Sequence, residues 1–499
     1  MSQALAVSVN APQRLDPSVV RVGKDIVELV TSGMYLSPIT IYREYVQNSA
    51  DAIELGIKEG LIKVGEGSVA INIDHGARSV RIVDNGIGIK ATDAASLLLA
   101  IGGSAKRGTG ARGFRGIGRL SGIAYCKALH FRTRAAGEDT VSVVEWDCKR
   151  LRQRLSDDSF EGDLHSVITS SVRFLEQPAR GEDPSHFFEV TMVEVARHRG
   201  DILLNEATIR DYLGQVAPVD FSERFSLGAK IRGRLADHGV DVGIVDLSIQ
   251  GERVLRPYAN VTTFPGNLFE LKLDEVEFFE FANIDGEVAA VGWVAHHQYA
   301  RSIPPSLGIG RLRARIGDVQ IGGEGVFDEV FKETRFNGWC VGEIHILDRR
   351  IQPNGRRDHF ELNHHAYNLL AQLGPKAIEL SHRCRTSSIS RNILLMIQNL
   401  VEEIEKKLAE SSLPSKGEIS RFRGSIERAR GRLKNVDHLE ARELCEAALS
   451  RVSHLLDQVP SDSDGGVIAL DEVSSLVRSI VTNRDQARKL LEALQSVAS

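Results

Sequence analysis

Apolar residues recur at helical spacing between residues 39 and 57. They form a narrow stripe when successive residues are turned by about 100°, and the stripe consists of Ile39, Val46, Ala50, Ile53 and Ile57. Just before it, Ser37 offers a hydroxyl that can cap a helix, and Pro38 suits the first helical position. The pattern therefore predicts an amphipathic helix that begins at Pro38.

The opposite side of this helix carries Glu44, Asn48 and Asp51. An ordinary amphipathic helix turns such residues toward water, so a solvated face is one interpretation. The alternative is a binding site, because Glu44 and Asn48 place a carboxylate and an amide one helical turn apart. The sequence that follows the helix favours the binding site.

Two short runs of alternating apolar residues, 69–73 and 80–82, predict a β-hairpin with one buried face. The second run leads directly into Asp84, which is followed by Gly86 and Gly88. Glycines can adopt positive φ and let the backbone approach a flat ligand closely. A carboxylate beside them can accept a hydrogen bond from an exocyclic amine such as that of adenine. An Asp-Asn-Gly turn is also common without any ligand, and this remains the alternative.

Residues 101–122 form a glycine-rich, basic segment that runs into the apolar residues 123–129. Such a segment can offer backbone N–H groups to phosphates, and a helix after it adds the positive end of its dipole. Lys106, Arg112 and Arg115 contribute further positive charge. A flexible linker is the alternative, but linkers are rarely this basic while also carrying large apolar side chains. The composition favours a loop that closes over phosphates.

Three motifs in this order resemble those of the GHKL ATPases, which include gyrase B, the ninety-kilodalton heat-shock chaperones, the histidine kinases and MutL. The motifs are Glu44-x-x-x-Asn48-x-x-Asp51, Asp84-x-Gly86-x-Gly88 and Gly113-Phe-Arg-Gly116. Their order and spacing together carry the resemblance, since each alone is short. It implies a Bergerat-type α/β sandwich that binds ATP over residues 1–195. Histidine kinases generally lack the first glutamate and place a phosphoacceptor helix first, so the chain is more similar to the chaperones and MutL.

The resemblance implies that Asp84 binds the adenine amine, with Gly86 and Gly88 closing around the base. Asp51 would support either the helix or the adenine side. The family usually carries a Gly-Thr on a late strand of this domain. The corresponding residues 185–191 lack that dipeptide, so no threonine is assigned.

The phosphate side of the implied site would bind ATP with Mg²⁺. Asn48 would be the metal ligand, since Mg²⁺ usually takes few protein ligands. Glu44, one turn away, would act as the general base for the attacking water. The remaining expected nucleotide contacts are Ser104, Lys106, Gly113, Arg115, Gly116 and Gly118.

Residues 196–385 alternate apolar patterns with Gly and Pro turns, and strands are predicted at 240–247, 288–295 and 339–347. The resemblance implies an α/β transducer domain here. After the last strand, Asn354-Gly-Arg356-Arg357 resembles a chaperone segment in which Asn-x-x-Arg places an arginine on the γ-phosphate. Arg357 fits this spacing as a catalytic residue that neutralises phosphate charge, and Arg356 is its neighbour. A solvated basic turn is the alternative.

Residues 386–499 change to apolar positions at three- and four-residue spacing with many charges between them. The predicted helices are 389–410, 416–433, 438–456 and 470–494, with a linker at 460–466. A packed bundle and a dimerisation element both fit this pattern. The resemblance to ATP-gated clamps favours a homodimer. The predicted fold class is thus α+β, with a sandwich domain, an α/β middle domain and a helical C-terminal region.

Composition narrows the classes of protein further. The five cysteines form no close pair typical of a metal knuckle or a redox motif, and the histidine pairs at 296–297 and 364–365 lack a convergent ligand set. A net charge of −5 gives no global attraction to nucleic acid, although a local basic groove is compatible with it. The start lacks a basic signal region and no apolar run reaches membrane-spanning length, which predicts a cytoplasmic protein without a membrane partner.

Two functional classes fit these features, and both couple ATP hydrolysis to a macromolecule. In the favoured class the protein is chaperone-like and its client is a protein. In the alternative it is a DNA-directed ATPase or clamp resembling MutL, MORC or topoisomerase subunits, without nuclease activity because no nuclease motif is evident. Gly113–Gly116 is closer to MutL, whereas 354–357 is closer to the chaperones. A degenerate pocket used only for binding is a third reading, which the presence of both Glu44 and Asn48 opposes.

Overall fold

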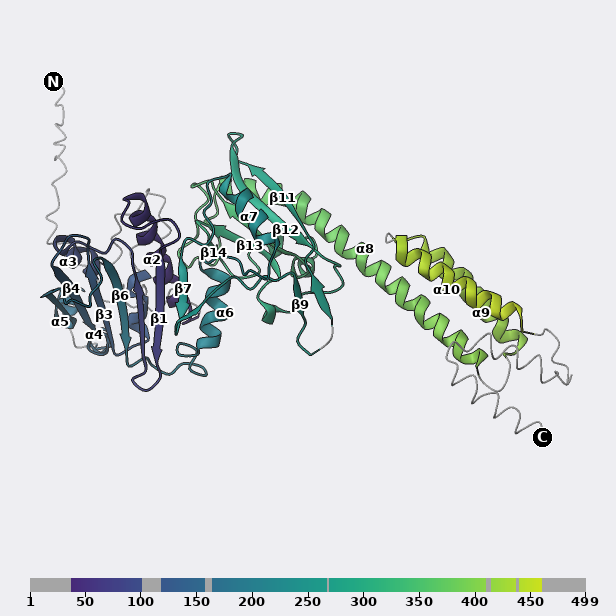
Figure 1. Cartoon of the computed structure of the whole chain (residues 1–499), viewed down its shortest axis with the longest axis horizontal. Helices are drawn as coiled ribbons and strands as arrows, with labels where there is room; N and C mark the ends of the chain where they lie inside the picture. The colour runs from purple at the N-terminus through teal and green to yellow at the C-terminus, as the bar shows by residue number, and fades with distance from the viewer. Residues whose placement is uncertain are drawn as a thin grey trace, which may run out of the picture. The chain divides into compact units, whose positions relative to one another are not determined.

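The computed structural model describes residues 37–100, 118–157, 164–266, 269–409, 414–436 and 439–459. They group into two compact units. The first contains the described residues up to 297 together with 303–330 and 340–374, and the second contains 298–302, 331–339 and the described residues from 375 onward. Figure 1 shows two sheets followed by long helices, so the predicted mixed α/β class with a helical C-terminal region is confirmed.

The N-terminal sheet has eight strands in the order β5-β4-β3-β6-β2-β1-β7-β8. All neighbours are antiparallel except β1 and β7, which run parallel. In chain order the strands are β1 (Ser68–Asp74), β2 (Ser79–Asp84), β3 (Ala128–Arg134), β4 (Thr140–Asp147), β5 (Val172–Pro178), β6 (Phe187–Val193), β7 (Asp246–Ile249) and β8 (Glu252–Arg253). The predicted hairpin is confirmed as β1 and β2.

Helix α2 (Thr40–Lys58) packs its predicted apolar stripe into the core of this sheet, where Val46, Ala50 and Ile53 are fully buried. The predicted cap is wrong. Ile39 is the N-cap, and its apolar side chain cannot accept a hydrogen bond. Ser37 and Pro38 instead form a turn whose carbonyls accept from the N–H groups of Thr40 and Ile41. The helices that accompany the sheet are α3 (Ala91–Leu99), α4 (Cys148–Leu155), α5 (Leu164–Ser171) and α6 (Glu206–Val216), with the 3₁₀ segment η2 (Gly118–Ala124).

A five-stranded sheet follows, in the order β11-β12-β15-β13-β14. Its strands are β11 (Glu275–Ala282), β12 (Val288–His296), β13 (Arg311–Ile316), β14 (Val319–Ile321) and β15 (Val341–Ile346), accompanied by helix α7 (Leu227–Ala236) and the small pair β9 (Val261–Thr263) and β10 (Glu270–Lys272). The strands predicted at 288–295 and 339–347 are confirmed as β12 and β15.

The strand predicted at 240–247 is largely wrong, because only its last two residues belong to a strand. Gly243 has φ of +74° and packs tightly against Asp220, so the chain turns there instead of extending. The strand that follows is β7, which joins the N-terminal sheet beside β1. That sheet therefore continues beyond residue 195, and the domain division at 195 and 385 stays a prediction.

The helical region begins earlier than predicted. Helix α8 spans His364–Leu408 and contains Pro375, whose lack of an N–H makes a helix across it hard to foresee. The predicted second and third helices are confirmed as α9 (Lys416–Leu433) and α10 (Leu439–Asp457), and they pack with α8 around a shared apolar core. Residues 460–466 and 470–494 lie outside the described residues.

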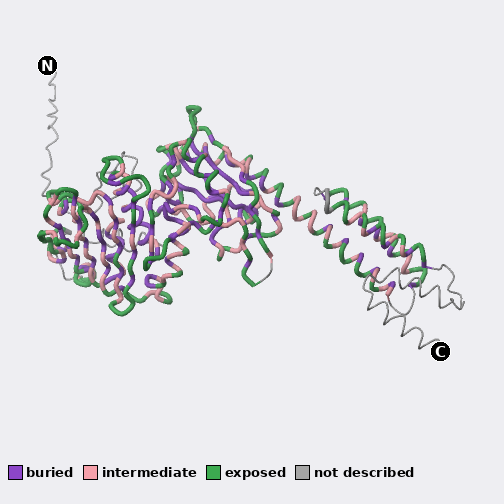
Figure 2. Tube along the Cα trace, in the orientation of Figure 1, coloured by how far each residue is buried: buried purple, intermediate pink, exposed green. Residues whose placement is uncertain are grey.

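Buried residues follow most strands of the two larger sheets, but the edge strands β5 and β8 are largely exposed (Figure 2). All five cysteines are free thiols. Within the described ranges, every helix is too short or too polar to cross a membrane.

Candidate ATP site

The polar side of α2 is covered rather than solvated. Glu44 and Asp51 are only 5% and 8% exposed, and Gln47 between them is equally buried. Asn48 is half-buried. The solvated-face interpretation is therefore wrong for both carboxylates. Because burying a carboxylate costs free energy unless it is compensated, their surroundings matter.

Glu44 lies between two arginines and a glycine. Its Oε1 atom is 3.3 Å from Nη2 of Arg43 and 3.9 Å from Nε of Arg357. On the other side of the carboxylate, a Cβ atom at Gly118 would collide with Oε2. The chain at Gly118, predicted as a nucleotide contact, therefore passes close to the Glu44 carboxylate, and a larger residue there would displace it.

Arg357 reaches α2 from a short hairpin in which Pro353 bridges Phe360. The hairpin is held by Asn354, whose Nδ2 donates to the Asp358 carboxylate over 2.6 Å and whose carbonyl accepts from the Arg357 N–H over 3.1 Å. Arg357 is 9% exposed, and its Nη1 donates to Oε1 of Gln47. The solvated-turn alternative is therefore wrong for Arg357, whereas its neighbour Arg356 is exposed.

Gln47 is a site residue that sequence reasoning missed. It lies three residues after Glu44 and four before Asp51, so all three share one side of the helix. That spacing was the available signal. Its partner, Arg357, is 310 residues away in the chain, and nothing local indicates the pairing.

The other end of α2 meets the turn after β2. Asp84 is 3% exposed, and its Oδ1 accepts a hydrogen bond from the Gly86 N–H over 2.9 Å. A Cβ at Gly86 would press on Ala52 of α2, and a Cβ at Gly88, which has φ of +67°, would collide with the Arg134 carbonyl. Both glycines are therefore structurally required, and the turn is tied to α2 near Asp51.

Two further residues fix this turn and were not predicted. Thr133 Oγ1 accepts from the Ile89 N–H over 2.9 Å and donates to a β6 carbonyl, while Nδ1 of His186 is 2.9 Å from the Gly86 carbonyl. On β6 itself, Phe188 lies directly opposite Asp84. The threonine of the family's Gly-Thr stays unassigned.

Five expected phosphate contacts lie outside the described residues, namely Ser104, Lys106, Gly113, Arg115 and Gly116. Their roles stay predictions, as does the metal-ligand role of Asn48. The donor set nevertheless fits Mg²⁺ chemistry, because Asn48 offers an amide oxygen on the face that also carries Glu44.

Residues 37–169 match the family model described as Histidine kinase-, DNA gyrase B-, and HSP90-like ATPase. This stretch begins just before α2 and includes the turn at Asp84 and the segment containing Gly118. The match supports a GHKL-type ATPase domain over residues 37–169, and domains of this class bind ATP, generally with Mg²⁺.

Proposed function

We propose that this chain binds ATP with Mg²⁺ and hydrolyses it, and that hydrolysis drives a conformational cycle. The observation that carries the proposal is the placement of Arg357 against Gln47 and Glu44 on α2. Glu44 and Ala52 are eight residues apart, which is about 12 Å along a helix. An extended nucleotide can span that separation, with its adenine at Asp84 and its γ-phosphate near Glu44.

The chemistry follows from what each side chain offers. Glu44 accepts the proton of the attacking water as general base. Arg357 donates to the γ-phosphate and neutralises charge that develops during transfer. Asn48 would hold Mg²⁺ through its amide oxygen, and the metal would supply positive charge to the phosphates. Asp84 accepts from the adenine amine, and Asp51 supports the turn through the neighbouring Ala52.

The coupling follows from where Arg357 originates. The arginine belongs to the region of the five-stranded sheet, whereas Glu44 belongs to the N-terminal domain. A γ-phosphate would give Arg357 a new partner, and its loss on hydrolysis would remove that partner. Nucleotide state would thus alter how the two regions are joined, which is what a clamp-like homodimer with a protein client requires.

The direct test is ATP turnover by the purified chain, with and without a chelator of divalent cations. Mg²⁺-dependent hydrolysis, together with a nucleotide-dependent change in mass measured by light scattering, is the expected result. Turnover that persists unchanged in excess chelator contradicts the metal role. Absence of turnover in the wild-type chain contradicts hydrolysis itself.

A DNA partner is a second candidate, favoured by one basic cluster in the second compact unit. Its segments 298–302, 331–339 and 375–391 hold seven basic residues and two acidic ones, Glu333 and Glu379, an excess of five positive charges. The basic residues are Arg301, Lys332, Arg335, Lys376, Arg383, Arg385 and Arg391. The Arg335 guanidinium lies 4.9 Å from the ring centroid of Phe336. Arginines with aromatic neighbours are typical of surfaces that bind phosphate backbones.

Salt dependence separates the two candidates. If duplex DNA binds the basic cluster, the logarithm of affinity should fall linearly with the logarithm of salt concentration. Reversing two exposed charges, Arg335→Glu with Arg385→Glu, should weaken binding and reduce that slope. Arg428→Glu on α9 is the matched control, because Arg428 is exposed outside the cluster. No binding, or equal loss in the control, favours the protein client.

A further inference from the structure

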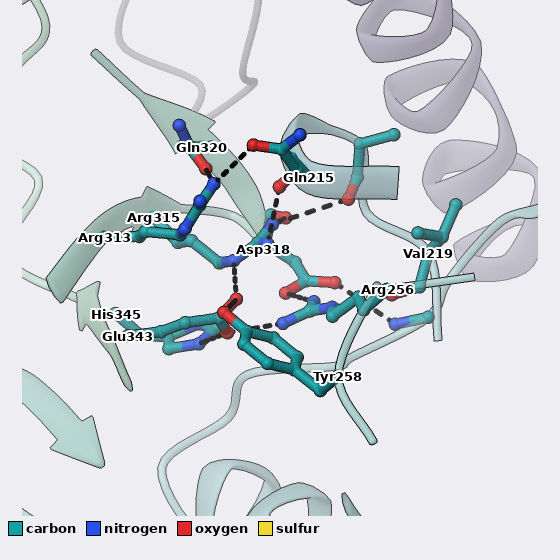
Figure 3. Close-up of polar contacts among 12 residues, drawn as sticks. Gln215, Val219, Arg256, Tyr258, Arg313, Arg315, Asp318, Gln320, Glu343 and His345 are labelled. Atoms are coloured by element: carbon teal, nitrogen blue, oxygen red, sulfur yellow. Dashed lines mark hydrogen bonds and ion pairs between the residues drawn. The ribbon is translucent and has the colours of Figure 1, made fainter. Parts of the chain in front are cut away.

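Four charged residues are fully enclosed beside the five-stranded sheet: Arg256, Arg315, Asp318 and Glu343 (Figure 3). Arg256 donates to Asp318 and Glu343, and Nε of Arg315 lies 2.7 Å from Oε1 of Glu343. Burial alone would raise the pKa of Glu343, but the Arg256 and Arg315 guanidiniums hold that pKa well below its usual range. The cluster is therefore a set of buried ion pairs.

Buried ion pairs are a poor way to gain stability, because apolar residues of similar volume often stabilise a fold as well or better. Their distinctive property is geometric, since each guanidinium fixes several partners at once. What the arginines of strand β13 fix is therefore the informative question. They bind two elements, the C-terminal end of α6 and the strand β14.

The first element leads to the ATP-site helix. Nη2 of Arg315 donates to the Gln215 carbonyl over 2.8 Å, and Nη1 of Arg313 donates to the Gln215 side chain over 3.0 Å. Gln215 lies at the end of α6, which packs into the same core as α2. Helix α2 is also tied to the segment just before α6, because the Tyr42 hydroxyl donates to the Leu203 carbonyl over 2.5 Å. By binding Gln215, the two arginines therefore hold α6, the helix that packs in the same core as the helix that carries Glu44.

The second element leads to Arg357. Nη1 of Arg313 also donates to Oε1 of Gln320 over 3.0 Å, and Nε2 of Gln320 donates to the Gly322 carbonyl over 3.2 Å. The Gly322 N–H in turn donates to the Arg357 carbonyl over 2.8 Å. Gly322 has φ of +73° and its position leaves no room for a Cβ beside the Asp358 carbonyl. The hairpin is therefore fixed against β14 at Arg357 and Asp358.

We propose that Arg313 is a positioning residue for Arg357. It joins Gln215 of α6 to Gln320 of β14. It therefore fixes β14, which holds the hairpin of Arg357, relative to α6, which packs with the helix that carries Glu44. The assignment rests on the proposed function, because it concerns the rate of ATP hydrolysis. Arg313 is 1% exposed and belongs to the five-stranded sheet, so it acts through its protein partners, which also include Glu324 at 3.7 Å and the Gly310 carbonyl at 3.4 Å.

A lysine at 313 keeps the positive charge but cannot reproduce the planar fork of an arginine. It should therefore weaken the link between Gln215 and Gln320 without removing the charge at this position. Displacing a catalytic group by about 1 Å can lower a rate by roughly 100-fold. We expect Arg313→Lys to lower kcat for ATP by roughly 10- to 100-fold while KM changes by less than about twofold. Gln320→Met, which removes the amide link alone, should give a similar loss.

The decisive measurement is a double-mutant cycle with Arg357→Ala. If Arg313 acts through Arg357, then Arg313→Lys should have no further effect on kcat once Arg357 is alanine. Arg311→Lys is the matched control, because Arg311 lies on the same strand but pairs with Asp328. Its kcat should stay at the wild-type value.

Three outcomes overturn the role of Arg313. They are wild-type kcat in both Arg313→Lys and Gln320→Met, losses that multiply independently in the Arg357→Ala background, and an equal loss in Arg311→Lys. Thermal unfolding of each variant identifies a general loss of folding, in which case Gln320→Met carries the test. Absence of turnover in the wild-type chain would instead overturn the proposed function, and this role with it.

Discussion

Replacing Glu44 by alanine is expected to abolish ATP hydrolysis while leaving ATP bound. A general base contributes about 10²- to 10⁴-fold to a rate, so kcat should fall by at least about 100-fold. The structure adds a reason for retained binding. Glu44 lies beside Arg357 and Gly118, at the opposite end of α2 from the turn at Asp84, so its removal leaves the expected adenine contact intact.

The measurement is steady-state phosphate release combined with nucleotide affinity by calorimetry. Glu54→Ala is the matched control, because Glu54 lies on the same helix but pairs with Lys58 at the surface over 2.6 Å. Glu44→Gln should match Glu44→Ala, since glutamine keeps the shape but cannot take a proton. Normal turnover in either Glu44 variant contradicts the base assignment.

Elements that depend on local periodicity could be predicted from the sequence. Helix α2 and the β1–β2 hairpin each show their buried face directly in the spacing of apolar residues, and α9 matched to the residue. The candidate site could be predicted as far as its motifs are local. Asp84, Gly86 and Gly88 follow one strand end, and a turn of this kind is fixed by neighbouring residues.

What could not be predicted depends on contacts between distant segments. Strand β7 joins β1 in parallel from 178 residues later in the chain, and no spacing within β7 indicates which sheet it completes. The burial of Glu44 and Asp51 could not be predicted either, because the sequence pattern of a polar helix face is the same whether water or protein covers it. The pairing of Gln47 with Arg357 belongs to this group.

These long-range contacts also change the role that we assign to α2. From the sequence alone, α2 is only the helix that presents the residues of one motif. In the structure α2 contacts three separate parts of the chain, namely the turn at Asp84, helix α6 and the hairpin of Arg357. A nucleotide bound along such a helix would touch parts of the chain that are far apart in sequence, which is the physical requirement for coupling hydrolysis to a change of conformation.

Asp84→Asn is expected to remove ATP binding, and the reason is a mismatch of donors. In the wild type Oδ1 of Asp84 accepts from the Gly86 N–H, and the second oxygen is the proposed acceptor for the adenine amine. Asparagine has only one oxygen. If that oxygen keeps the bond to Gly86, the NH₂ group meets the adenine amine, and two donors face each other.

The expected loss is large because the position is buried. An unpaired buried donor costs about 1–3 kcal/mol, and here two donors would be left unpaired, so affinity for ATP should fall by at least about 10-fold by calorimetry. Asp74→Asn is the matched control, since Asp74 also ends a strand and its Oδ1 accepts from the Ala77 N–H over 2.8 Å, but it is exposed. The unliganded variant should unfold at a temperature close to that of the wild type, because the bond to Gly86 survives. Wild-type affinity in Asp84→Asn would show that adenine binds elsewhere, and a loss of affinity in Asp74→Asn as well would attribute the effect to the hairpin.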